Sequence, residues 1–229
     1  MVSVLTDIGA DVIKIGMLGN SEIINAVADV IDEHAPETTI VLDPVMVATS
    51  GDILLEEIAV KVLIERLIPH ADVITPNAPE AARLTGLAVD DVDTMRAAGQ
   101  ALLMMGAFSA VMKGGHIDGP ALVDLLITEQ GMSMMSGPRI RTRHTHGTGC
   151  TLASAIAAGL ARGLDLETAV QSARDFVYQA IASAPKLGST DKNARGPLNH
   201  GLVSMEAEGE DTPTEPASDN PFAALKGLN

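Results

Sequence analysis

Residues 144–163 read H-T-H-G-T-G-C-T-L-A-S-A-I-A-A-G-L-A-R-G, and the interpretation of the whole chain depends on this stretch. Its second half predicts a helix, because Leu152, Ile156 and Leu160 recur at four-residue spacing with small alanines between them. Its first half places two glycines where a loop becomes that helix. Glycine lets backbone N–H groups approach an anion closely, and the positive end of the helix dipole favours negative charge. The pattern is typical of an anion site at residues 147–150, although glycine-rich turns also serve purely structural purposes.

Cys150 falls in the first turn of this predicted helix and has more than one reading. A helix N-terminus lowers the pKa of a thiol, so Cys150 could carry or accept a proton near neutral pH. Alternatively, it is a small apolar residue that fills the core. The glycines in front of it favour the chemical role, because a packing cysteine does not need them.

The neighbouring His144 and His146 raise another chemistry, a Cys–His nucleophilic pair for acyl transfer. No buried acid that would orient the histidine can be identified, so we disfavour this reading. Metal binding through the histidines lacks a thiolate or carboxylate at ligand spacing.

Length and charge limit the class of protein. The 229 residues suit one domain, or one domain with a tail. The 30 acidic residues against 15 basic ones argue against a nucleic-acid partner or an anionic membrane. A single cysteine excludes an internal disulfide, and neither a signal peptide nor a long apolar span is visible. We therefore expect a cytoplasmic protein.

Short apolar runs alternate with helical patterns through the first half of the chain. The predicted strands are 11–17, 39–42, 72–75 and 110–113, and the predicted helices are 21–34 (with Ser21 as N-cap), 52–67, 77–84 and 91–105. This alternation indicates a parallel sheet covered on both faces.

After residue 119 the pattern changes. It predicts a hairpin of 121–128 with 132–135, a last strand at 139–143 and a long helix at 166–184. From residue 204 onward the composition shifts to Glu, Asp, Pro and Thr. We expect one domain over 1–203 and a disordered acidic tail over 204–229.

Polar side chains follow the predicted parallel strands at the edge where ligands of open α/β sheets bind. These residues are Asp43, Asn77, Glu80, Lys113 and His116. The first four also have a structural explanation. Asp43 precedes a proline, so it either holds Mg²⁺ through water or starts a turn. Asn77 and Glu80 form a capping-box pattern as well as a candidate site. Lys113 either neutralises a phosphate or is a solvated lysine at a strand end.

Several motifs together resemble one family. T-H-G-T-G-C-T at 145–151 is similar to the anion-hole motif of the ribokinase-like small-molecule kinases, in the form found in the hydroxymethylpyrimidine / phosphomethylpyrimidine kinases of thiamine biosynthesis. The sugar kinases of that superfamily carry an aspartate where Cys150 stands. The resemblance extends to D-I-G-A-D-V-I-K-I-G-M-L at 7–18, D-P-V-M-V-A at 43–48, T-P-N-A-P-E-A at 75–81, K-G-G-H at 113–116 and G-P-L-N-H at 196–200.

The resemblance implies a ribokinase-like three-layer α-β-α fold with a mostly parallel sheet, the cofactors ATP and Mg²⁺, and a homodimer. It implies two successive phosphorylations, of 4-amino-5-hydroxymethyl-2-methylpyrimidine and then of its monophosphate. Catalysis would be mostly positioning and charge stabilisation. The implied roles are stabilisation of the transferring phosphoryl group by Gly147, Thr148 and Gly149, activation of the substrate hydroxyl by Cys150, nucleotide binding by Lys113, Asn77 and His116, and metal binding by Glu80 and Asp43.

The chain departs from the family pattern at its start. Family members begin with a strand and a Gly-rich turn, followed by lid strands that build much of the pyrimidine pocket, and the match here begins after them. We therefore expect the 229-residue chain to be a poor pyrimidine kinase with an intact phosphate half. Two alternatives stay open: pyridoxal or pyridoxine kinase activity, and a catalytically impaired fragment that keeps nucleotide binding.

Overall fold

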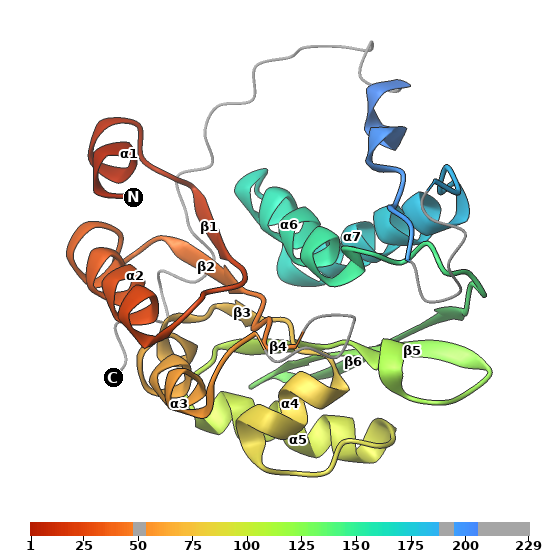
Figure 1. The fold of residues 1–229 in the computed structure, drawn as a ribbon, viewed down its shortest axis with the longest axis horizontal. Helices are drawn as coiled ribbons and strands as arrows, with labels where there is room; N and C mark the ends of the chain where they lie inside the picture. The colour runs from red at the N-terminus through yellow and green to blue at the C-terminus, as the bar shows by residue number, and fades with distance from the viewer. Residues whose placement is uncertain (48–53, 188–194, 206–229) are drawn as a thin grey trace.

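The centre of the molecule is a six-stranded sheet whose spatial order follows the sequence, β1-β2-β3-β4-β5-β6 (Figure 1). The computed structural model describes residues 1–47, 54–187 and 195–205. Four strands run parallel, and a long hairpin adds two antiparallel strands at one edge. The strands are β1 Val12–Ile15, β2 Thr39–Leu42, β3 Val73–Ile74, β4 Ser109–Met112, β5 Ala121–Thr128 and β6 Gly131–Pro138.

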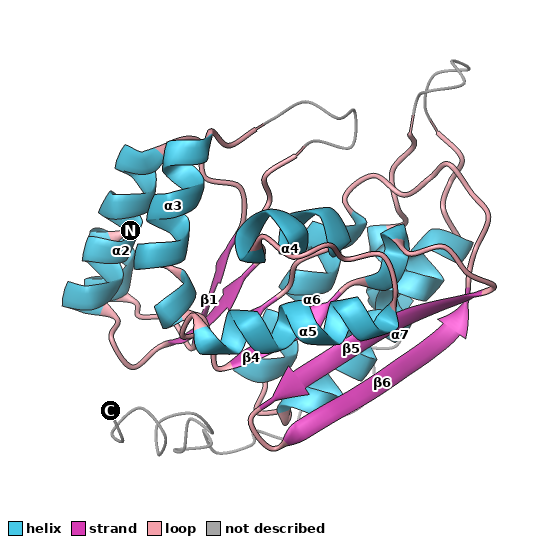
Figure 2. Ribbon diagram, turned by 90° about the horizontal axis from the view of Figure 1, so that it is seen from below, coloured by secondary structure: helices cyan, strands magenta, loops and turns pink. Residues whose placement is uncertain are grey.

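Helices cover both faces of this sheet, which gives the three layers expected from the sequence (Figures 1 and 2). One face carries α2 Ser21–His34, α3 Glu57–Arg66, α4 Ala78–Thr85 and α5 Val92–Met104. The other carries α6 Thr148–Ala161 and α7 Leu166–Ala182. Shorter elements are α1 Val2–Asp7, η1 Ile68–His70, η2 Gly114–His116 and η3 His200–Met205.

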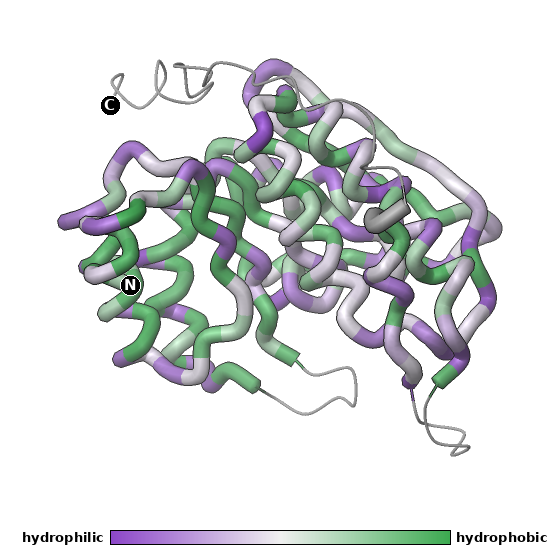
Figure 3. The backbone as a smooth tube through the Cα atoms, turned by 90° about the horizontal axis from the view of Figure 1, so that it is seen from above, coloured by the Kyte–Doolittle hydropathy of each residue, from purple (hydrophilic) through white to green (hydrophobic). Residues whose placement is uncertain are grey.

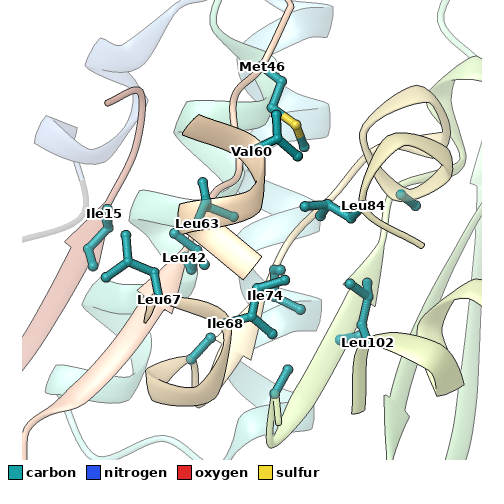
Figure 4. Packing of buried hydrophobic residues seen from close by; sticks show 14 of the residues in the cluster. Ile15, Leu42, Met46, Val60, Leu63, Leu67, Ile68, Ile74, Leu84 and Leu102 are labelled. Carbon is teal, nitrogen blue, oxygen red and sulfur yellow. The ribbon is translucent and has the colours of Figure 1, made fainter. Parts of the chain in front are cut away.

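Strand β2 shows why the parallel strands read as continuous apolar runs. Its side chains alternate, so Ile40 and Leu42 enter the core beneath α2–α5, while Val41 enters the core beneath α6 and α7. Figure 4 shows the first of these cores, with Leu42 and Ile74 from the sheet packed among Leu63 and Leu67. Because helices cover both faces of the sheet, the strand does not alternate between apolar and polar residues.

The expected elements are largely confirmed, with differences that have local causes. Helix 21–34 and strand 39–42 have the predicted bounds. The cap of α2 is Asn20 and not Ser21, because the Asn20 side chain accepts the Ile23 N–H at 2.9 Å. The predicted helix 52–67 is shorter, since α3 spans Glu57–Arg66, and residues 48–53 lie outside the described ranges. Helix α1 was not predicted, and none of its residues is buried.

The predicted last strand at 139–143 is wrong. Pairing of β5 with β6 ends at Ala121 and Pro138, and the chain continues without strand structure. The Arg139 side chain turns toward the loop after β4, where it donates to the carbonyls of Gly115 and Ile117 at 2.8 and 2.7 Å. Residues 139–143 therefore serve as a connection to α6 and not as part of the sheet.

At the opposite edge, β1 pairs only with β2 within the described residues. Apolar side chains around it are exposed, including Val4, Ile8 and Met17, and the hydrophobic colouring reaches the first residues near the N-terminus (Figure 3). The acidic tail was expected over 204–229; residues 204 and 205 end η3, and residues 206–229 lie outside the described ranges. No described helix is long and apolar enough to cross a membrane.

Candidate active site

Backbone hydrogen bonds beyond the strand ends fix the polar residues side by side. Asp43 N–H donates to the Ile15 carbonyl at 2.8 Å, Thr75 N–H to the Leu42 carbonyl at 2.9 Å, and Lys113 N–H to the Pro76 carbonyl at 2.9 Å. Each donor is the first residue after its strand, so each bond continues the parallel pairing beyond the end of that strand. The carboxyl ends of β1 to β4 consequently form one edge, as the sequence predicted for Asp43 and Lys113.

The Asp43 carboxylate is fully buried at the centre of this edge. Its Oδ1 accepts hydrogen bonds from Lys113 Nζ at 3.0 Å and Thr75 Oγ1 at 3.2 Å. Its Oδ2 has no hydrogen-bond partner, and Lys14 Nζ lies 3.8 Å from it. A buried charge needs such pairing, because desolvation would otherwise cost several kcal/mol.

Glu80 reaches the same cluster from the first turn of α4. The predicted capping box is confirmed: Glu80 N–H donates to Asn77 Oδ1 at 2.9 Å, and Asn77 N–H donates to Glu80 Oε2 at 2.8 Å. The same Oε2 lies 3.7 Å from Lys113 Nζ. Burial raises the pKa of Glu80, and the neighbouring Lys113 only partly offsets this. The capping hydrogen bonds therefore hold the Glu80 carboxylate inside the cluster. Capping and a functional role of Glu80 are compatible.

Lys113 links the two carboxylates to the helix of the glycine motif. Burial lowers its pKa, but Asp43 and then Glu80 act more strongly together, so the pKa of Lys113 is raised and the side chain stays charged. A Cβ placed on Gly149 would lie 3.0 Å from Lys113 Nζ. The absence of a side chain at Gly149 lets the ammonium group approach the N-terminus of α6.

The glycine motif forms that N-terminus, as predicted. Gly147 is the N-cap with a φ of +83°, in the left-handed region that favours glycine. Thr148 is used by the turn itself, because its N–H and its hydroxyl both donate to the Thr145 carbonyl. First-turn amides of a helix have no intrahelical acceptor, so those of Gly149 and Cys150 are the groups suited to receive an anion.

The pKa expected for Cys150 is wrong. The side chain is exposed at the start of α6, which also excludes the reading as a buried core residue. Partial desolvation raises the pKa of the thiol, and the negative charge of Asp43 raises it further. Lys14 and Lys113 act in the opposite direction without outweighing these causes. Desolvation and the nearby Asp43 carboxylate together raise the pKa, so the thiol is held in its neutral form.

The loop after Lys113 is held by side chains from elsewhere in the sheet. Gly114 N–H donates to Asp124 Oδ1 at 2.8 Å, and the second oxygen of Asp124 accepts from Arg174 Nε at 2.8 Å. Arg139 holds the following carbonyls, as described above. Desolvation lowers the pKa of His116 in this loop, and the charge of Lys113 lowers it further. The loop thus presents a neutral histidine within a locally cationic region.

A second feature is an open cleft of about 370 Å³ next to Cys150, also lined by Thr151, Ser154, Ala155, Phe176 and His200. His200 Nε2 lies 2.9 Å from Thr151 Oγ1. His144 is instead buried against Gly196, where a Cβ would meet its Nδ1. Within the described residues no hydrogen bond joins Cys150 to His144 or His146, so the geometry gives the acyl-transfer reading no support.

The carboxylates of this edge are also candidate ligands for a metal ion. No described group of three or more His, Cys, Asp or Glu side chains could hold an ion by itself. Magnesium is commonly bound by one or two carboxylates together with substrate phosphates and water. The unpartnered, buried Oδ2 of Asp43 and the Glu80 carboxylate fit that requirement.

A buried carboxylate–lysine cluster facing a helix N-terminus, at the carboxyl edge of an α/β sheet, suits the transfer of a phosphoryl group to a small molecule. The model of the phosphomethylpyrimidine kinase family matches residues 1–198. The chain belongs to this family, which confirms the family, the fold and the kinase class predicted from the sequence.

Individual relatives agree with this assignment. The chain is 43% identical over 204 residues to a hydroxymethylpyrimidine/phosphomethylpyrimidine kinase of Streptomyces coelicolor, covering 89% of this chain and 73% of the relative. It is 41% identical to the Escherichia coli enzyme of the same description, covering 86% and 74%. Among solved structures, a Staphylococcus aureus pyridoxal kinase in complex with AMP-PCP has a TM-score of 0.80 at 33% identity, covering 90% and 73%. A Clostridium difficile phosphomethylpyrimidine kinase has a TM-score of 0.69 at 37% identity, covering 78% and 72%.

Sequence reasoning missed four residues that hold this site together. Lys14 and Thr75 contact the Asp43 carboxylate, and Asp124 and Arg139 hold the loop after Lys113. Lys14 left a signal, since a lysine inside an otherwise apolar buried strand needs a partner. The others depend on contacts between distant segments and had no comparable signal.

The loop after Lys113 predicts contrasting effects of two adjacent substitutions. A Cβ on Gly114 would lie 1.8 Å from the Val123 carbonyl oxygen, whereas a Cβ on Gly115 would meet nothing within 4 Å. Gly114→Ala should therefore destabilise the protein by about 1–3 kcal/mol, and Gly115→Ala should leave it close to the parent. Thermal unfolding monitored by circular dichroism measures both. Equal melting temperatures for the two variants would contradict the packing described here.

The environment of Cys150 predicts slow alkylation at neutral pH. Because the chain has one cysteine, iodoacetamide labelling followed by mass spectrometry reports this thiol alone. The midpoint of the rate against pH should lie above the ordinary thiol value of about 8.5. Asp43→Asn should move the midpoint down, since Asp43 raises the pKa. Cys150→Ser controls for labelling elsewhere, and a midpoint below that of a free thiol in the parent protein would contradict the account.

Proposed function

We propose that the chain transfers the γ-phosphoryl group of ATP to 4-amino-5-hydroxymethyl-2-methylpyrimidine and then to the resulting monophosphate. The observation that carries the proposal is the convergence of Asp43, Glu80 and Lys113 on the N-terminus of α6. Phosphoryl transfer needs little covalent chemistry from the protein. It needs positioned groups that stabilise charge on the transferred phosphoryl oxygens, and this edge of the sheet provides them.

Each group has a role that follows from its position. The amides of Gly149 and Cys150 would receive the oxygens of the transferred group at the positive end of α6. Lys113, charged and adjacent to Gly149, would neutralise phosphate oxygens of the nucleotide. Asn77 and His116 flank Lys113: Asn77 forms a parallel bridge with it, and His116 follows it in η2. Thr148 and Gly147 would act indirectly, by fixing the turn.

Asp43 and Glu80 are the residues that would hold Mg²⁺. When bound, the ion would neutralise charge on the nucleotide phosphates. The chain's own contribution is to keep both carboxylates buried beside a cation. Lys113 pairs with each of them, at 3.0 and 3.7 Å.

Cys150 is the group placed to exchange a proton with the substrate hydroxyl. It is exposed, borders the cleft and stands beside the amides that would hold the transferred group. Its raised pKa means that it begins as a neutral thiol, so it must first release its own proton to solvent before it can accept the proton of the hydroxyl. Offsetting the negative charge of Asp43 would favour that release.

A pyridoxal or pyridoxine kinase activity is the second candidate, because several of the similar solved structures are pyridoxal kinases. Identity separates the two. The pyridoxal kinases are 33% identical to this chain, whereas curated pyrimidine kinases reach 43% and 44%. We therefore favour the pyrimidine. The homodimer, the cytoplasmic location and the tail from residue 204 remain predictions.

The proposal is tested by incubating the chain with ATP, Mg²⁺ and either the pyrimidine or pyridoxal, and by measuring ADP release and the product masses. We expect the pyrimidine monophosphate and diphosphate as products. Phosphorylation of pyridoxal alone would favour the second candidate. ATP binding without any phosphorylated product would support the impaired-fragment reading.

Cys150→Ala should lower turnover of the pyrimidine alcohol by about 10²–10⁴-fold and leave ATP affinity nearly unchanged. The reason is that Cys150 would touch the acceptor hydroxyl and not the nucleotide base or ribose. Steady-state kinetics and calorimetric ATP binding measure the two effects. Ser154→Ala, a change on the same helix and the same cleft, is the matched control. Parent-like turnover of Cys150→Ala would remove the proton-exchange role.

Glu80→Gln should reduce turnover at limiting Mg²⁺ by roughly 10–100-fold and change the melting temperature little. The amide oxygen can still accept the Asn77 N–H, so the cap survives while the charge near Lys113 is lost. Glu22→Gln, in the first turn of α2, is the control for removing an exposed first-turn carboxylate. If only the melting temperature falls and the Mg²⁺ dependence is unchanged, Glu80 is a capping residue alone.

A further inference from the structure

Lys14 is a lysine on the edge strand β1 whose ammonium group turns back into the site. Its Nζ lies 3.8 Å from Asp43 Oδ2, the buried oxygen without a hydrogen-bond partner. A Cβ on Gly16 would lie 2.8 Å from the same Nζ, so the side chain folds over Gly16 and does not extend away from the strand. About a fifth of the Lys14 side chain remains exposed, at 21%. The charge is therefore fixed at the site but still accessible to a ligand.

The two lysines of the site divide the two oxygens of Asp43 between them. Lys113 hydrogen-bonds to Oδ1 and also lies near Glu80, so two carboxylates share its charge. Lys14 faces Oδ2 at the longer distance of 3.8 Å, and this is the only ion pair that Lys14 makes within the described residues. With two carboxylates and two lysines the charges of the cluster balance. Lys14 is the less strongly engaged of the two cations and can interact with an incoming anion.

The position of Lys14 corresponds to the acceptor side of the reaction. Helix α6, which carries Cys150, packs on β1 and β2. In agreement, Lys14 lowers the pKa of the Cys150 thiol by more than Lys113 does. Lys113 instead approaches Gly149 and Glu80, on the side assigned to the nucleotide. The two cations thus flank the path of the transferred group.

We propose that Lys14 is the acceptor-side cation of this site and binds the phosphate of the pyrimidine monophosphate in the second phosphorylation. The inference rests on the function proposed above. In that step an oxygen of the substrate phosphate attacks the γ-phosphorus of ATP, a new P–O–P bond forms, the bond to the β-phosphate bridging oxygen breaks, and ADP leaves. The attacking oxygen already carries negative charge, so no proton has to be removed. A cation that offsets repulsion between the two phosphates is needed instead.

The two phosphorylations should therefore depend on different residues. The alcohol must lose a proton, so the first step depends on Cys150, whereas the second depends on Lys14. Calorimetric binding of the alcohol and of the monophosphate, with ADP and Mg²⁺ present, tests this in the 229-residue chain. Lys14→Met should weaken monophosphate binding by about ten- to hundredfold and alcohol binding by less than about threefold. Lys14→Arg should retain most of the affinity for the monophosphate.

Lys61→Met, which removes an exposed lysine from α3, is the matched control and should bind both ligands as the parent does. Gly16→Ala keeps every charge but displaces the Lys14 ammonium group, and should give a smaller loss confined to the monophosphate. A parent-like circular dichroism spectrum and melting temperature show that each variant is folded. Where turnover is measurable, Lys14→Met should lower the second phosphorylation more than the first.

Equal weakening of both ligands by Lys14→Met would overturn the inference, because Lys14 would then only support Asp43. An unchanged monophosphate affinity would overturn it as well. If the parent chain binds ATP–Mg²⁺ but neither pyrimidine ligand, the proposed function fails and the inference fails with it. The inference alone fails if the parent binds both ligands and Lys14→Met weakens the binding of both equally.

Discussion

The buried ion pairing of Asp43 is the interaction on which the rest of the site depends. A carboxylate with no exposed surface persists only if cations and hydrogen-bond donors compensate for lost water. Here the donors come from three other strands or strand ends: Lys14, Thr75 and Lys113. The parallel register that brings β1, β3 and β4 beside β2 is therefore also what makes the buried charge tolerable. Slippage of one strand by a residue would move its donor to the opposite face.

The same interaction explains how a strongly acidic chain can bind an anionic nucleotide. The formal net charge is −15, yet the site gathers Lys14, Lys113 and the loop held by Arg139 at one edge of the sheet. Buried or partly buried charges are screened far less than exposed ones, so the local cations matter more than the overall charge. The α6 N-terminus adds fixed dipoles at the same place. The charge at this edge is therefore set by its own residues and not by the net charge of the chain.

The sequence predicted the layers of the fold and most of the elements because the apolar periodicities are strong and local. It also predicted that Asp43 and Lys113 would share one edge, and that Asn77 and Glu80 would form a cap. The sequence-based prediction was wrong where contacts between distant segments determine the structure or the pKa. The thiol pKa of Cys150 was expected to be lowered by the helix N-terminus, but desolvation and the carboxylate of Asp43, from a different element, raise it. The expected strand at 139–143 was lost because Arg139 binds the loop after β4, a contact that residue patterns do not show.

In the proposed function, the carboxyl edge around Asp43 and the first turn of α6 together hold the terminal phosphate of a nucleotide. A crystal structure of the chain with Mg²⁺ and a non-hydrolysable ATP analogue tests it most directly. We predict a terminal phosphate within hydrogen-bonding distance of the Gly149 and Cys150 amides and of Lys113 Nζ, with density for a cation beside Asp43 and Glu80. A nucleotide whose phosphates lie away from α6 and from Lys113 would contradict the account.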